Sequence, residues 1–284
     1  MTSAVRAACV IGWPIEHSRS PLIHNYWLKA YHIPGAYRRE AVPPEQFRPF
    51  VESLAARGYV GANVTVPHKE AALACSVPDD RARAVGAANT LWLDGELRST
   101  NTDVEGFLDN LDACVPGWDR NRGPALVLGA GGAARAVVYA LLQRGIESIV
   151  VANRSAQRAQ ALQERFGPRV HTARWDESNA RLAGAKLLVN TTTLGMQGQP
   201  GLALHLERLP ADAVVVDLVY VPAVTSLLHA ANARGLRTAD GLGMLLYQAV
   251  RGFSLWFGRK PQVTEELRRL LQADLSVPGA LAQE

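Results

Sequence analysis

Apolar runs of strand length alternate with helical patterns over the first 65 residues of the chain. The runs bounded by turn-forming residues are 7–11, 37–42 and 59–65. Between them, the spacing of apolar residues predicts helices over 20–31 and 44–57. Ser20 is a favourable N-cap for the first helix, with Pro21 at its first helical position. Such alternation predicts a mostly parallel sheet in an α/β domain.

A helix is predicted over 104–113, and a second alternating pattern begins after residue 124. Its predicted strands are 125–128, 149–152, 186–190 and 213–217. The predicted helices after residue 124 are one that ends before Gly145 and those at 224–234, 244–257 and 261–273. Asp94-Gly95 is typical of a hairpin turn. The Gly- and Pro-rich stretch 116–124 is the clearest linker, and it predicts two separate α/β domains.

Three glycines lie between the predicted strand 125–128 and the helix that follows it. Gly129 allows a tight turn, Gly131 lets backbone N–H groups approach a pyrophosphate, and the small Ala134 lets helix and strand pack closely. Gly132 completes the triplet. A plain tight turn would also explain such glycines, but their place between strand and helix favours nucleotide binding.

The end of the next predicted strand indicates which nucleotide is bound. NAD-binding folds usually carry an Asp or Glu about 20 residues after the glycines, to bind the ribose 2′-hydroxyl. Here that position is Asn153, followed by Arg154, Ser155 and Arg158. Two guanidinium groups and a hydroxyl can hold a 2′-phosphate, which a carboxylate would repel. The pattern therefore favours NADP over NAD, although the two arginines could also be a solvated helix face.

Composition is that of an ordinary globular protein, with 48% hydrophobic and 20% charged residues among 284. The net charge of +4 fits an anionic cofactor and substrate, and the arginines are too dispersed to indicate a nucleic-acid partner. The cysteines are Cys9, Cys75 and Cys114, whose number and spacing predict neither a disulfide framework nor a metal site. Without a signal-like or membrane-spanning run, the chain is expected to be cytoplasmic.

Polar side chains at predicted strand ends are the candidates for chemistry. Ser18 and Ser20 flank a helix start and form a potential anion site, although capping alone explains Ser20. Asn63 and Thr65 share one face of their strand. Lys69, just beyond this strand, is electrostatically unfavourable near a helix start, which argues for a role other than a surface charge.

Taken together, the motifs of this chain resemble those of the shikimate dehydrogenase family. The matching stretches are GWPIEHSRSPLIHN at 12–25, NVTVPHKE at 63–70, GAANTL at 86–91, NTDVEGF at 101–107, GAGGAARA at 129–136, NRSAQR at 153–158, NTTTLGM at 190–196, DLVY at 217–220 and ADGLGMLLYQA at 239–249. They extend over almost the whole chain in the family's order and spacing, which makes the resemblance far more specific than any single motif.

The resemblance implies NADPH-dependent reduction of 3-dehydroshikimate to shikimate, on the route to aromatic amino acids. It makes Lys69 and Asp103 the catalytic pair. The implied substrate contacts are Ser18, Ser20, Asn63, Thr65, Asn89, Tyr220 and Gln248. The expected NADP contacts are Gly129, Ala130, Gly131, Gly132, Ala133, Asn153, Arg154, Ser155, Arg158, Thr191, Thr192, Leu218, Gly241 and Met244.

The fold expected from this resemblance consists of two α/β domains with a cleft between them. Residues 1–115 and 240–284 would form the substrate-binding catalytic domain, and residues 116–239 a Rossmann NADP-binding domain. The partners expected are the small-molecule substrate and NADP, without nucleic acid or membrane. The protein is expected to be a monomer or a homodimer.

Two departures from the family pattern leave related functions open. Val221 replaces an Asn that many members carry after the tyrosine, and Val104-Glu105 replaces a Gly-containing step after the aspartate. A quinate/shikimate dehydrogenase or a paralogue acting on a related polyol acid is one alternative. A non-catalytic NADP-binding sensor is another, and the presence of both Lys69 and Asp103 argues against it.

Overall fold

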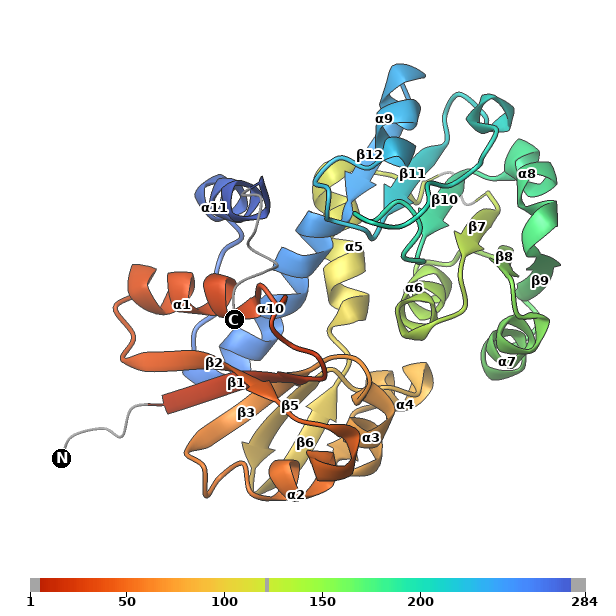
Figure 1. The fold of residues 1–284 in the computed structure, drawn as a ribbon. Coiled ribbons are helices and arrows are strands. Elements are labelled where there is room, and N and C mark those ends of the chain that lie inside the picture. Colours follow the sequence, from red (N-terminus) through yellow and green to blue (C-terminus); the bar gives the residue numbers. More distant parts are fainter. Residues whose placement is uncertain (1–5, 121–122, 277–284) are drawn as a thin grey trace. The chain divides into compact units, whose positions relative to one another are not determined.

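The computed structural model describes residues 6–120 and 123–276, in which the chain forms two compact units (Figure 1). Unit 1 comprises Met1–Thr102 and Leu246–Glu284, and unit 2 comprises Asp103–Leu245. The domain limits expected from the sequence instead assign residues 103–115 and 240–245 to the first domain. Asn110 Nδ2 donates to the carbonyl of Asp240 at 2.7 Å. This hydrogen bond joins residues 103–115 to residues 240–245 within unit 2.

The sheet of unit 1 is mixed. Its strands, in spatial order, are β2 (Gly35–Ala41), β1 (Arg6–Gly12), β3 (Tyr59–Val64), β5 (Thr90–Asp94), β6 (Glu96–Thr100) and β4 (Val77–Pro78). β1 pairs in parallel with β2 and β3, as the β–α alternation predicts. β5 and β6 form the expected hairpin around Gly95, whose φ of 69° suits the turn. This hairpin makes β5 antiparallel to β3.

Helices cover both faces of this sheet. Those of unit 1 are α1 (Ser20–Ala30), α2 (Phe47–Glu52), α3 (Lys69–Ala74), α4 (Asp80–Val85), α11 (Glu265–Ser276) and the greater part of α10 (Gly241–Phe257), and a 3-10 turn at Pro44–Gln46 precedes α2. Cys9 and Ile11 of β1 share a core with Phe47 and Leu54. On the other face, Trp256 Nε1 donates to the carbonyl of Leu91 at 2.8 Å.

Two helix predictions for unit 1 were wrong in detail. Ser20 is the first residue of α1 and Arg19 occupies the N-cap position, whereas the Ser18 hydroxyl accepts from the Ser20 backbone nitrogen at 3.4 Å. The predicted helix 44–57 is divided into a 3-10 turn and the short α2. The chain turns after α2, where the Arg57 backbone nitrogen donates to the Ser53 carbonyl and Gly58 adopts a φ of 79°.

Unit 2 is a doubly wound parallel sheet. Its strands, in spatial order, are β12 (Arg237–Asp240), β11 (Val214–Asp217), β10 (Leu187–Asn190), β7 (Ala125–Leu128), β8 (Ile149–Asn153) and β9 (Val170–Arg174). All adjacent pairs are parallel. Numbered from β7, this is the 3-2-1-4-5-6 order of the Rossmann fold, which reverses between β7 and β10. Ligands of such folds bind at the carboxyl ends of the strands at that point.

The helices of unit 2 lie on both faces of its sheet (Figure 1). They are α5 (Asp103–Cys114), α6 (Gly132–Gln143), α7 (Ala156–Phe166), α8 (Ser178–Arg181), α9 (Ser226–Ala233) and the start of α10, with 3-10 turns at Trp175–Glu177, Leu182–Gly184 and Leu206–Arg208. β7 is apolar throughout and β10 is apolar up to Asn190, and both strands are fully buried, as is typical of central parallel strands. Within residues 6–120 and 123–276, every helix is too short or too polar to cross a bilayer.

Candidate functional site

Three of the predicted substrate residues lie at one edge of the unit 1 sheet. Asn63 in β3 pairs in register with Thr90 at the start of the antiparallel β5. Thr65 follows β3 and donates from its backbone nitrogen to the carbonyl of Ile11 at 2.9 Å. Asn89 immediately precedes β5, and its carbonyl accepts from the Val64 backbone nitrogen. We call this edge, formed by residues 63–65 and 89–90, the substrate edge.

Asn89 is the centre of a buried hydrogen-bond network. Its Oδ1 accepts from the backbone nitrogen of Thr102 at 2.7 Å and from the Thr102 hydroxyl at 3.1 Å. The residue is only 3% exposed, so these bonds compensate for the loss of hydration. Thr102 directly precedes the predicted catalytic residue Asp103. The network therefore fixes the backbone immediately before Asp103.

Ser18 and Ser20 lie in a short braced segment before and at the start of α1. Arg39 of β2 donates from Nε and Nη2 to the carbonyl of Ser18, at 3.0 and 2.8 Å. The backbone nitrogen of Ser20 donates to the Ser18 hydroxyl at 3.4 Å. These bonds fix the backbone that carries both serines.

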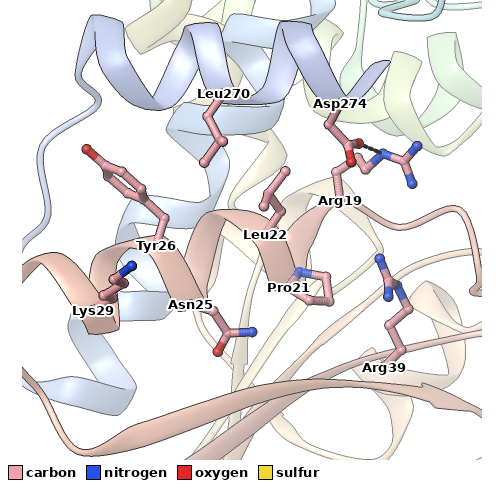
Figure 2. A pocket seen from close by; sticks show the side chains of 9 residues that line it. All are labelled: Arg19, Pro21, Leu22, Asn25, Tyr26, Lys29, Arg39, Leu270 and Asp274. Carbon is pink, nitrogen blue, oxygen red and sulfur yellow. Dashed lines mark ion pairs between the residues drawn. The ribbon is translucent and has the colours of Figure 1, made fainter. Parts of the chain in front are cut away.

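A pocket of about 480 Å³ lies beside this segment, between α1 and α11 (Figure 2). Arg19, whose side chain is buried, forms an ion pair with Asp274 of α11 at 2.5 Å. Arg39 also lines the pocket. Its lining, within the part of the chain that the structure describes, contains none of the predicted substrate residues. The pocket is therefore separate from the substrate edge, although Arg39 also contacts the Ser18 segment.

Lys69 is the first residue of α3 and is half-buried. The Lys69 carbonyl accepts from the backbone nitrogen of Ala88 at 2.9 Å, so the start of α3 lies next to the loop that carries Asn89. The preceding His68 is buried, stacks on Phe47 and donates from Nε2 to the Val42 carbonyl at 2.7 Å. Burial lowers the pKa of His68, which keeps this ring neutral and fixes the loop that presents Lys69.

The remaining predicted substrate and catalytic residues come from α10 and from unit 2. Gln248 is half-buried on α10, in the part that belongs to unit 1. Asp103 begins α5 in unit 2 and is 4% exposed, and Tyr220 follows β11 in the same unit. Because Lys69 and Asp103 belong to different units, their cooperation stays a prediction.

The glycine loop of unit 2 has the geometry that a bound pyrophosphate needs. Gly129 has a φ of 103°, and a Cβ there would lie 2.7 Å from the Thr191 hydroxyl, so only glycine fits. By contrast, a Cβ at Gly131 or Gly132 would meet open space. Gly131 occupies the N-cap position of the 12-residue α6, whose first N–H groups point out of the helix. The loop thus leaves an open cradle at a helix N-terminus, flanked by Ala130 and Ala133.

The predicted 2′-phosphate residues follow β8 as one exposed group. Asn153 ends β8, and its Nδ2 donates to the carbonyl of Ser155 at 2.9 Å. Ser155 is the N-cap of α7 and accepts from the backbone nitrogen of Arg158. The guanidinium-bearing residues Arg154 and Arg158 are both exposed. The position at the end of β8 lies next to the glycine loop, because β7 and β8 are adjacent parallel strands.

A buried polar network holds the loops that carry the other predicted cofactor residues. Asp217 Oδ1 accepts from Asn190 Nδ2 at 2.8 Å, and Asp217 Oδ2 accepts from the Thr225 hydroxyl at 2.6 Å. Asn190 Oδ1 in turn accepts from the backbone nitrogen and the hydroxyl of Thr192. Thr191 donates from its hydroxyl to the Leu128 carbonyl at 2.7 Å. Asp217 and Asn190 thus join the loops after β10 and β11 to each other, and Thr191 joins the loop after β10 to the carboxyl end of β7.

The start of α10 lies against the loop after β11. A Cβ at Gly241 would lie 2.2 Å from the carbonyl oxygen of Leu218, so this close approach requires glycine. Met244, one turn further on, is 8% exposed. The predicted contacts Leu218, Gly241 and Met244 are thereby near one another within unit 2.

Family models match three successive parts of the chain. They are described as shikimate dehydrogenase substrate binding domain, over residues 10–91, shikimate / quinate 5-dehydrogenase, over 118–197, and shikimate 5'-dehydrogenase C-terminal domain, over 241–272. A curated relative from Rhodopseudomonas palustris strain TIE-1, named shikimate dehydrogenase (NADP(+)), is 65% identical over 97% of this chain and 99% of its own. The chain belongs to the shikimate dehydrogenase family. A relative of the same name from Nitrobacter hamburgensis is 63% identical over 96% of both chains.

Solved structures of shikimate dehydrogenase family members have the same fold. The Thermus thermophilus shikimate 5-dehydrogenase in complex with NADP(H) and shikimate is 39% identical, with a TM-score of 0.82, over 94% of this chain and 99% of that one. A quinate dehydrogenase from Corynebacterium glutamicum in complex with NAD is 31% identical, with a TM-score of 0.87, over 95% and 99%. Fold similarity alone therefore does not separate the two activities.

Several polar residues of this family member were not among those predicted for the site. The buried ones that hold predicted site residues or their loops in place are Tyr37, Thr90, Thr102, Asn190, Asp217 and Thr225. Their signal in the sequence was a polar residue at the end of an apolar strand, as at Asn190 and Asp217. Tyr37 gave no such signal, because its ring fits a strand core as any aromatic residue would.

Proposed function

We propose that the protein is an NADP-dependent shikimate dehydrogenase, which reduces 3-dehydroshikimate reversibly to shikimate for the biosynthesis of chorismate and aromatic amino acids. The observation that carries this proposal is the 65% identity over 97% of the chain with a curated shikimate dehydrogenase (NADP(+)). We place the reaction in the cytoplasm, where the free thiols of Cys9, Cys75 and Cys114 would stay reduced. The protein would act as a monomer or a homodimer.

The cofactor half of the proposed site is unit 2. The open space at Gly131 and Gly132 and the N-terminus of α6 suit a pyrophosphate. Arg154 and Arg158, beside Ser155, would bind the 2′-phosphate through charge-assisted hydrogen bonds. When bound, NADP supplies the hydride acceptor for shikimate oxidation, and NADPH supplies the donor for the reverse reaction. The absence of a carboxylate at Asn153 supports NADP rather than NAD.

The substrate half of the proposed site is the substrate edge with the Ser18–Ser20 segment. The hydroxyls of Ser18 and Ser20 would donate to the carboxylate of shikimate. Amide and hydroxyl groups would bind the ring hydroxyls. The residues that provide them are Asn63, Thr65, Asn89, Tyr220 and Gln248. The dense hydrogen bonding of Asn63 and Asn89 supports this role, since fixed polar groups recognise a polyol without first having to be ordered.

Lys69 would handle the proton at the reacting oxygen. When hydride reaches the carbonyl carbon of 3-dehydroshikimate, negative charge develops on the oxygen, and an ammonium can stabilise it and donate a proton. In the oxidation direction, Lys69 as a neutral amine would accept the hydroxyl proton. Asp103 would orient Lys69 and the neighbouring substrate hydroxyl. This assignment requires that the two units present Lys69 and Asp103 to the same substrate.

The experiment that tests this function compares shikimate with quinate as substrate of the purified protein, with NADP present and the product identified. Shikimate dehydrogenase activity predicts rapid formation of 3-dehydroshikimate and slow or no oxidation of quinate. Faster oxidation of quinate would support the quinate/shikimate dehydrogenase alternative, and oxidation of only a related polyol acid would support a paralogue. Binding of NADP without turnover of any of these substrates would support a sensor.

A further inference from the structure

The hydroxyl of Tyr37 is buried beside the substrate edge. It donates to Asn63 Oδ1 at 2.6 Å, which leaves Asn63 Nδ2 to donate to the Thr90 hydroxyl at 3.1 Å and to the Asn89 carbonyl at 3.3 Å. With an O–H donor on one side and two acceptors on the other, the amide of Asn63 has a single favourable orientation. Tyr37 therefore determines which way the Asn63 amide points.

Tyr37 is itself held in place by two neighbouring residues of α1. The His24 ring stacks on the Tyr37 ring, with 4.1 Å between centroids and 9° between planes. Asn25 clamps the Tyr37 backbone, because its Nδ2 donates to the Tyr37 carbonyl and its Oδ1 accepts from the Tyr37 nitrogen, both at 3.0 Å. Figure 2 shows Asn25 extending from α1 toward the neighbouring strand. The position of the phenol is thus fixed at both its ring and its backbone.

The phenol of Tyr37 stays protonated at its place beside Asn63. Burial raises the pKa of Tyr37 well above its usual value, and the hydroxyl therefore remains a donor to Asn63 across the working pH range.

We propose that Tyr37 is a positioning residue for the substrate, whose hydroxyl holds the Asn63 amide in the orientation that binds a polyhydroxylated ring. This inference rests on the proposed function. Tyr37 acts through Asn63 and does not itself act on the reacting atoms. Removing the Tyr37 hydroxyl leaves Asn63 Oδ1 without its donor and allows the Asn63 amide to rotate. Shikimate binding must then also order this amide, which makes the free energy of binding less favourable.

Tyr37→Phe tests the proposal because it removes one oxygen and keeps the ring that stacks on His24. The expected result is a rise of about tenfold in the KM for shikimate, from the loss of about one hydrogen bond. The kcat and the KM for NADP should stay within about twofold of the wild type. Tyr31→Phe is the matched control, since the Tyr31 hydroxyl accepts from the Gln262 backbone nitrogen at 3.0 Å, away from the substrate edge.

If the Tyr37 hydroxyl had a purely structural role, Tyr37→Phe would behave like Tyr31→Phe: the melting temperature would fall and the KM for shikimate would stay unchanged. That result would overturn the inference. Equal rises in the KM values for shikimate and NADP would overturn it as well. The increase in melting temperature caused by added shikimate provides a readout that does not depend on turnover, and Tyr37→Phe should reduce it. If the wild-type protein neither binds nor oxidises shikimate, the proposed function itself fails, and this inference fails with it.

Discussion

At the scale of single residues, the proposed site depends on polar side chains that are buried at the ends of strands. Asn89, Asn190 and Asp217 are each at most 3% exposed, and each makes several hydrogen bonds. Burial of such groups is costly unless they are paired, so they contribute little net stability and mainly fix geometry. The loops that present Lys69, Thr191 and Thr192 are fixed by bonds of this kind.

Lys69→Ala should reduce the rate of shikimate oxidation by roughly 10²–10⁴-fold, which is the usual contribution of a general acid or base. The affinity for NADP should change little, because Lys69 belongs to unit 1, whereas the glycine loop and the arginines proposed to bind NADP belong to unit 2. Lys29→Ala, at an exposed position near the end of α1, is the matched control. A parallel loss of NADP binding in Lys69→Ala, measured by fluorescence titration, would contradict the catalytic assignment.

His24 should make folding stability depend on pH. Burial lowers its pKa from the usual 6.5 to about 3, and this outweighs the effect of the Asn63 side chain, which acts in the opposite direction. The unfolded chain therefore binds a proton on this imidazole over a range in which the folded protein does not. Stability should fall as the pH is lowered from 6.5 toward 3, by up to about 1.4 kcal/mol per pH unit from this group.

His24→Phe keeps an aromatic ring against Tyr37 and removes the titrating group. Its free energy of unfolding in urea should depend less on pH below 6.5 than that of the wild type, while His17→Phe, at an exposed position, should leave the dependence unchanged. Identical pH profiles for His24→Phe and the wild type would show that this imidazole is not kept neutral by burial.

At the scale of elements, strands and helices with a clear apolar pattern could be predicted from the sequence, and those without one could not. The strand 125–128 and the helix after the glycines were confirmed, because a buried parallel strand and an amphipathic helix each have such a pattern. β4, α8 and β9 were not predicted, since two to five residues that are only partly apolar carry too little periodicity. The 11-residue α7 was also not predicted, because it buries only Ala159 and Leu162. The cap of α1 was misassigned because Ser20 is a favourable N-cap residue, whereas the backbone makes Ser20 the first helical residue and places Arg19 at the N-cap.

The turn from β8 into α7 should determine the choice of cofactor. Arg154→Ala should raise the KM for NADP at least about tenfold, through the loss of charge-assisted hydrogen bonds to the 2′-phosphate, and should change the KM for NAD little. Arg165→Ala, exposed near the end of the same helix, should affect neither value. Equal effects of Arg154→Ala on both cofactors would exclude a role in binding the 2′-phosphate.

The end of β11 should be important for both stability and cofactor binding. Asp217→Ala removes the acceptor of Asn190, Thr225 and the Val219 backbone nitrogen, and should lower the free energy of unfolding by about 1–3 kcal/mol. The KM for NADP should rise, since Asn190 holds the Thr192 loop. Asp176→Ala, in an exposed pair with Arg174, should cost less than about 1 kcal/mol. Equal losses in the two variants, by urea unfolding, would contradict the bracing role of Asp217.

At the scale of the whole molecule, the protein consists of two α/β units with separate roles. The presence of two α/β units follows from the alternation of strands and helices in the sequence, and the Rossmann fold of the second was expected from its glycine loop and the family resemblance. The extent of each unit was harder to predict, because α5 is joined to unit 2 by tertiary contacts such as that between Asn110 and Asp240, which leave no local pattern. Among the site residues, this places Lys69 in unit 1 and Asp103 in unit 2.

The measurement that tests the central claim most directly is kcat/KM for shikimate oxidation by the wild-type protein, with saturating NADP and then with saturating NAD. We expect rapid oxidation with NADP and a preference over NAD of at least about tenfold, since each charge-assisted bond to the 2′-phosphate contributes about 1.5–3 kcal/mol. Equal rates with both cofactors, a preference for NAD, or no oxidation of shikimate would contradict it.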